Sequence, residues 1–84
     1  EYFSGGVKTG ELVIFTKNLS GMLKAGLSLS RSLSVLEKQT KNKTLNKILK
    51  SIIDDINGGG TFSSGLEKFP KVFSKLFIGF SREI

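Results

Sequence analysis

The sequence predicts an all-α fold: a small antiparallel bundle of about five helices joined by short corners. Apolar residues recur at three- and four-residue spacing through most of the 84 residues, as on one face of an amphipathic helix. Glycine-rich or polar corners separate these segments, and no segment shows the sustained alternation of a half-buried strand. The length fits one domain. We place a lead-in or linker at residues 1–8 and the helical domain at residues 9–84.

The first helix is expected over about residues 10–25, with Thr9 as its N-cap and Glu11 favourably placed in its first turn. Gly21 lies in its interior, where glycine costs about 1 kcal/mol relative to alanine. Its small size would let another backbone approach closely. The predicted apolar face is broadened by Val13 and Ile14 and is otherwise formed by Leu12, Phe15, Leu19, Met22 and Leu23.

The corner at residues 25–30 is the point around which the chain is organised. Gly26 can adopt a positive φ and end the first helix, and Ser28 can cap the second. The second helix is expected over about residues 29–40. Its interspersed serines either allow close packing against a neighbour or are solvated. Its apolar stripe consists of Leu29, Leu33 and Leu36, with Val35 alongside.

The third helix, over about residues 43–57, has the clearest apolar face, and Asn42 can cap it. Near its C-terminus Asp54 and Asp55 oppose the helix dipole, and we expect a Lys50–Asp54 pair to offset part of this cost. The face is formed by Leu45, Ile48, Leu49, Ile52, Ile53 and Ile56, and we expect Ile48, Leu49, Ile52 and Ile56 to be buried.

Three glycines at residues 58–60 end the third helix, and no Gly-Lys-Ser/Thr follows that would make them a phosphate loop. A short fourth helix is expected from residue 62 or 63 to 68, with a capping box at residues 64–67. A fifth begins after Ser74. The predicted apolar face of the fifth helix consists of Phe73, Leu76, Phe77, Phe80 and Ile84.

The composition argues against catalysis. The chain contains no Cys and no His, which excludes disulfides and Cys-based zinc sites and removes the commonest general base. Asp54 and Asp55 are adjacent, so their carboxylates point about 100° apart on a helix. A cation site using Asp54, Asp55 or Glu67 ranks below the simpler interpretation of solvated carboxylates. We expect no catalytic residue, no cofactor and no metal.

The formal charge is +6, and no acidic residue lies between Lys38 and Ile53. The lysines of this stretch form a solvated face, a surface for an acidic protein or anionic lipid, or a nucleic-acid patch. Arginine, the usual residue for base and phosphate contacts, is scarce, so a small basic nucleic-acid-binding domain is the weaker alternative. The candidate partner or membrane surface consists of Lys41, Lys43, Lys47 and Lys50.

The order and spacing of several short segments between residues 7 and 82 resemble a cytoplasmic domain of the type II secretion F family. The resemblance implies a non-catalytic domain of an oligomeric platform in the bacterial inner membrane, on its cytoplasmic face. It further implies that this platform couples a cytoplasmic assembly ATPase to pilin insertion or extraction. The segments are residues 15–19, Met22-Leu23, Ala25-Gly26-Leu27-Ser28-Leu29, Gln39-Thr40-Lys41-Asn42, Gly60-Thr61-Phe62-Ser63, Phe69-Pro70, Val72-Phe73 and Leu76-Phe77.

Family members usually continue after the last helix with Gly-Glu-x-Ser-Gly and a further helix, whereas this sequence ends at Ile84. We therefore expect a fragment of a larger membrane protein, since no apolar run here approaches the ~20 residues of a membrane span. Without the further helix, the apolar face of the fifth helix would be exposed, and self-association would cover it. The candidate self-association residues are Phe73, Leu76, Phe77 and Phe80.

Overall fold

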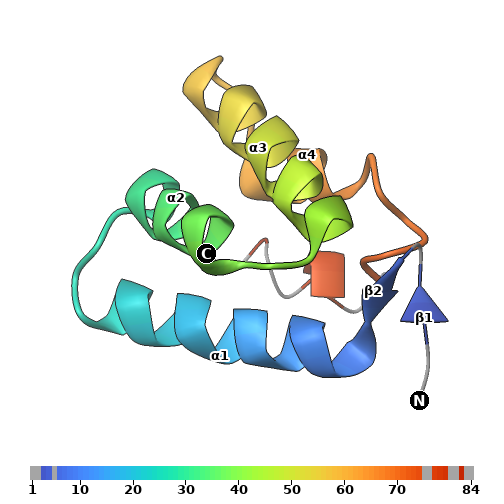
Figure 1. The fold of residues 1–84 in the computed structure, drawn as a ribbon. Helices are drawn as coiled ribbons and strands as arrows, with labels where there is room; N and C mark the ends of the chain where they lie inside the picture. The colour runs from blue at the N-terminus through green and yellow to red at the C-terminus, as the bar shows by residue number, and fades with distance from the viewer. Residues whose placement is uncertain (1–2, 5, 75–76, 80–81, 83–84) are drawn as a thin grey trace.

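The computed structural model of the chain describes residues 3–4, 6–74, 77–79 and 82. Its helices are α1 (Thr9–Lys24), α2 (Leu29–Gln39), α3 (Lys43–Asn57) and α4 (Phe62–Leu66). Figure 1 shows α1 along the lower side of the bundle, with α2 running back above it and α3 and α4 above and beside α2. Residues 77–79 are also helical. The all-α bundle predicted from the sequence is confirmed.

A short hairpin precedes the bundle, so the expectation that the chain contains no strand is wrong. Strands β1 (Phe3–Ser4) and β2 (Val7–Lys8) pair antiparallel, with Phe3 opposite Lys8. Gly6 turns the chain between them with φ of 88°. Val7 has no exposed surface. The core therefore includes a residue that we had assigned to the lead-in. The strands were not predicted because two residues are too few to show an alternating pattern in the sequence.

Helix α1 begins one residue earlier than predicted, and Thr9 is its first residue rather than its N-cap. Lys8 is the N-cap, and its backbone N–H donates to Glu11 Oε1 at 3.0 Å. Because α1 starts here, Glu11 lies in the first turn and its carboxylate faces the positive end of the helix.

The predicted apolar face of α1 was too wide. Phe15 and Leu19 are buried, but Val13 is 49% exposed and Ile14 is 61% exposed. At 100° per residue, Val13 and Ile14 each lie roughly 130° from the centre of the buried face. Gly21 has no atom within 4 Å of where a Cβ would stand, so no neighbouring backbone approaches it.

The organising corner forms as predicted. Gly26 has φ of 95°, and the N–H groups of Gly26 and Leu27 donate to the carbonyls of Leu23 and Met22, both at 3.1 Å. These two bonds make a Schellman motif, which satisfies the last carbonyls of α1. Ser28 Oγ then accepts from the Arg31 N–H at 3.1 Å and caps α2. The chain therefore reverses within a few residues, which places α2 against α1.

Helix α3 supplies the centre of the core. Ile48 is 5% exposed, and Leu49 and Ile52 are fully buried, as predicted, whereas Ile56 is only partly buried. Gly65 of α4 packs on this face, since a Cβ there would lie 3.3 Å from Ile52 Cγ2. The one buried polar side chain among the described residues, Ser32 of α2, donates from its hydroxyl to the Ser28 carbonyl at 2.8 Å.

After α4 (Phe62–Leu66), Val72, Phe73 and Ile78 are buried and belong to the core. The capping box of α4 is formed by Thr61 and Ser64, not by residues 64–67 as predicted, and α4 ends at Leu66. Ser74 Oγ accepts from the Phe77 N–H at 3.2 Å, which agrees with the predicted start of a fifth helix. The remaining residues of its predicted apolar face (Leu76, Phe80 and Ile84) lie outside the described residues.

Candidate interaction surface

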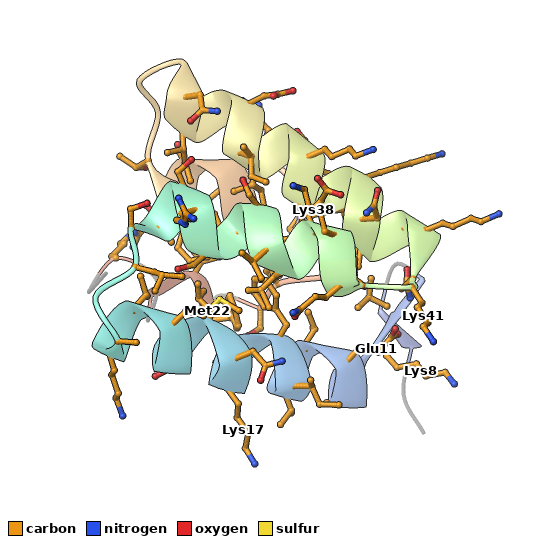
Figure 2. The ribbon with its side chains drawn as sticks, turned by 60° about the vertical axis from the view of Figure 1, so that its left-hand side comes forward. Lys8, Glu11, Lys17, Met22, Lys38 and Lys41 are labelled. Atoms are coloured by element: carbon orange, nitrogen blue, oxygen red, sulfur yellow. The ribbon has the colours of Figure 1, made fainter. Side chains whose placement is uncertain are left out.

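A row of lysines runs along the exposed side of α3. Lys43, Lys47 and Lys50 follow i, i+4, i+7 spacing, which places them on one helix face, and all three are exposed. Lys41 is exposed in the corner before α3. Figure 2 shows Lys41 at the same end of the bundle as Lys8 and Glu11. We call Lys41, Lys43, Lys47 and Lys50 the basic row. None of them makes an ion pair with a carboxylate in the described part of the chain.

Asn42 fixes the N-terminal end of α3, and with it the start of the basic row. Its Oδ1 accepts from the Leu45 N–H at 2.9 Å, which caps the helix as predicted. Its Nδ2 donates to the Gly6 carbonyl at 3.1 Å and to Glu11 Oε1 at 3.0 Å. One side chain therefore ties α3 to both the hairpin and α1, so the lysines project from a fixed scaffold.

Charges on α3 oppose its dipole at both ends. Lys43 lies in the first turn, beside the positive end, and Asp54 and Asp55 lie near the negative end. Asp55 is compensated by Lys68, whose Nζ lies 2.8 Å from Oδ1 and 2.7 Å from Oδ2. The Lys50–Asp54 pair considered from the sequence is absent among the described residues. Each exposed charge opposing the dipole costs about 0.3–1 kcal/mol at low ionic strength, so helix stability does not explain Lys43.

The carboxylates considered for a cation site do not converge. Asp55 is paired with Lys68, and Glu67 Oε1 lies 3.9 Å from Arg82 Nη2. Within the described ranges, no cluster of three or more His, Cys, Asp or Glu side chains is arranged to hold a metal ion. The surface therefore offers cationic and apolar contacts.

The residues proposed for self-association lie in different environments. Phe73 is 1% exposed and belongs to the core, so its side chain is not available to a second copy in this fold. Phe77 is partly buried, with its ring centroid 5.2 Å from that of Phe73 and 6.5 Å from that of Phe15. Leu76 and Phe80 lie outside the described residues. Self-association remains a prediction.

An open groove of about 670 Å³ borders the basic row, between α3 and the turn that follows α4. Sequence reasoning did not identify it, because it combines side chains from residues 44–51 and 68–72 that only the fold brings together. Two further lysines, Lys68 and Lys71, lie at this groove with Lys47. A Lys-x-x-Lys pattern around Phe69-Pro70 was the only signal in the sequence.

The sequence profile described as "Type II secretion system (T2SS), protein F" matches residues 15–82 of this chain. The chain belongs to this family. It is similar to the type IV pilus assembly protein PilC of Thermus thermophilus, with 43% identity over 72 residues, which cover 86% of this chain and 18% of the relative. It is also similar to PilC of Myxococcus xanthus, with 35% identity over 74 residues that cover 88% of this chain and 18% of the relative.

A third relative is the type II secretion system protein F of Xanthomonas campestris, with 35% identity over 71 residues, covering 84% of this chain and 18% of the relative. The chain thus spans less than a fifth of the length of these protein F family members. No helix in the described ranges has the length and apolar character required to cross a membrane. The match to the protein F family confirms the resemblance seen in the sequence.

Proposed function

We propose that this chain is a non-catalytic protein–protein interaction module of the inner-membrane platform in a type IV pilus or type II secretion machine. It lies on the cytoplasmic face, where it couples an assembly ATPase to pilin movement. Membership of the protein F family supports a role in a type IV pilus or type II secretion machine. The observation that carries the interaction role is the basic row. Its lysines make no ion pair within the described residues, three of them lie on a fixed helix, and Lys43 opposes the helix dipole.

The packing of α2 weakens the nucleic-acid alternative. In a helix-turn-helix the second helix enters the major groove, so one of its faces must present exposed side chains to the bases. Here only Arg31, Lys38 and Gln39 of α2 are exposed, and its other residues are buried or half-buried. Arg31 is its only arginine, and the basic row lies on α3 instead. A salt-dependent gel shift with duplex DNA checks this directly, and no shift is expected.

The double variant Lys43→Glu/Lys47→Glu is expected to weaken binding to the assembly ATPase of the same organism roughly tenfold or more. Each exposed charge contact contributes about 0.2–1 kcal/mol, and reversal replaces attraction by repulsion. Folding is expected to persist, because Lys43→Glu places a carboxylate in the first turn of α3, where it gains about 0.3–1 kcal/mol. Fluorescence anisotropy measures binding, and thermal melting measures stability.

The matched control is Lys17→Glu/Lys24→Glu on α1, which changes the net charge by the same amount. Both lysines are exposed, and Figure 2 shows Lys17 pointing away from the bundle. If the two double variants lose binding equally, the loss is caused by the change in net charge and not by the basic row. No loss in the α3 variant would leave the basic row as a solvated face. Parallel titration with phosphatidylglycerol vesicles shows whether the row contacts lipid instead.

We also propose that the chain forms a homodimer or larger oligomer through the apolar face predicted from the sequence for the helix after Ser74. Sedimentation equilibrium should show concentration-dependent association that Phe80→Asp abolishes. Ile14→Asp is the comparison variant, because Ile14 is the most exposed large apolar side chain in the described ranges. A strictly monomeric chain at high concentration would contradict the proposal, and loss of association only in Ile14→Asp would move the interface to α1.

A further inference from the structure

We propose that the groove beside α3 binds an acidic segment of a partner protein that inserts one bulky apolar side chain between flanking carboxylates. The proposal rests on the proposed function, because it assumes that the chain is a protein-binding module. The groove is lined by Thr44, Lys47, Ile48, Ser51, Lys68, Phe69, Pro70, Lys71 and Val72. We call it the lysine groove.

The chemistry of the lining specifies the occupant. The apolar part of its lining consists of the half-buried Phe69, the exposed Pro70 and the almost fully buried Ile48 and Val72, and lysines also contribute. No acidic side chain is among its described lining residues. An apolar surface bordered by positive charge is complementary to an apolar side chain flanked by carboxylates.

Most polar groups of the groove have no partner within the described residues. Lys47 and Lys71 have no ion pair among the described residues, and Lys68 is the one groove lysine held by a carboxylate, that of Asp55. The hydroxyls of Thr44 and Ser51 make no hydrogen bond within the described part of the chain. They can therefore donate to or accept from the backbone of an extended segment.

Both walls of the groove are fixed, so little ordering is needed on binding. One wall is α3, whose Ile48 is buried in the core. The other is a turn in which the N–H groups of Val72 and Phe73 both donate to the Phe69 carbonyl at 3.0 Å. Val72 and Phe73 are themselves buried, which anchors this turn. The Lys68–Asp55 ion pair joins the turn to α3.

A hollow favours a protein segment over a lipid surface. A bilayer is flat on the scale of this domain, so it would contact the protruding lysines and leave the apolar lining of the groove uncovered. A polypeptide segment can follow the hollow and bury one side chain in it. The membrane is therefore an alternative outcome of the test.

The test titrates the isotope-labelled chain with a synthetic peptide that carries one leucine between glutamates. Two control peptides replace the leucine with alanine or the glutamates with lysine. The first peptide is expected to shift the amide resonances of Ile48, Ser51 and Val72, and each control to bind at least several-fold more weakly. Equal binding of the alanine peptide, or shifts confined to other helices, would overturn the proposal.

Two variants assign the binding to the groove. Ser51→Trp is expected to abolish peptide binding by filling the hollow. Lys71→Glu is expected to weaken it roughly threefold to tenfold, by reversing one exposed charge contact; its control is Lys24→Glu on α1. Unchanged peptide binding in Lys71→Glu would overturn the proposal even if Ser51→Trp failed to fold.

The two proposals can fail separately. If Lys43→Glu/Lys47→Glu lowers ATPase binding but the peptide does not bind, the interaction role stands and the lysine groove is not its docking site. If the peptide binds in the groove while the ATPase does not bind, the groove stands and the ATPase is the wrong partner. If vesicles of phosphatidylglycerol and phosphatidylcholine bind through Lys71 and the peptide does not bind, the groove contacts a membrane surface and the proposal of a protein segment is wrong.

Discussion

Phe73→Ala is expected to lower the free energy of unfolding by about 3–5 kcal/mol, the range for deleting a buried aromatic side chain. Phe73 is 1% exposed, and its ring lies 5.2 Å from that of Phe77, so truncation removes a packed aromatic contact and leaves a cavity. Small domains have about 5–15 kcal/mol of total stability, so much of the protein should unfold at moderate urea concentrations. Urea denaturation followed by circular dichroism measures the loss.

This prediction decides between the two roles considered for Phe73. A core residue destabilises the monomer when it is truncated, whereas an interface residue changes association and leaves monomer stability nearly unchanged. Phe77→Ala is the comparison variant, because Phe77 is only partly buried and should cost less. If Phe73→Ala unfolds like the unmodified chain but no longer associates, Phe73 belongs to the self-association surface and not to the core.

Ile52→Ala is expected to cost about 2–5 kcal/mol, as for other buried isoleucine truncations. Ile52 has no exposed surface, and Gly65 of α4 packs directly on its side chain. The cavity would therefore open between α3 and α4, which lie in contact over this face. The midpoint of thermal unfolding should fall by many degrees, because a small domain unfolds with a small entropy change.

The control for this experiment is the neighbouring residue on the same helix. Ile53 has the same side chain but is only partly buried, so Ile53→Ala should cost clearly less. Equal destabilisation by the two variants would show that the buried face of α3 is misassigned. A melting temperature of Ile52→Ala equal to that of the unmodified chain would contradict the packing of α4 on α3.

The helices could be predicted from local signals, because the sequence shows both the helical spacing of their apolar residues and the residues that begin and end them. The bounds of α3 agree with the prediction, since Asn42 caps it and the glycines after Asn57 stop it. The N-terminal hairpin was missed because its strands are two residues long and it is held to the bundle by a tertiary contact, the hydrogen bond from Asn42 to the Gly6 carbonyl. Val13 and Ile14 were misassigned because hydrophobicity alone does not establish which apolar side chains face the core.

The candidate site likewise has one part that the sequence predicted and one part that it did not. The basic row was visible in the sequence because helical spacing alone aligns Lys43, Lys47 and Lys50. The lysine groove was not, because Lys71 and Lys47 are separated by α4 and the turn after it, and only tertiary packing places both at one hollow. The pairing of Asp55 with Lys68 likewise joins separate elements, and it also removes Asp55 from any cation site.

Amide chemical-shift mapping of the labelled chain with the assembly ATPase tests the central claim most directly. The interaction module predicts saturable shifts along the exposed side of α3, centred on Lys43 and Lys47, that weaken as salt screens the charges. Val13 and Ile14, on the exposed side of α1, should stay unchanged. Shifts confined to that side of α1, or no shifts at any ATPase concentration, would contradict the account.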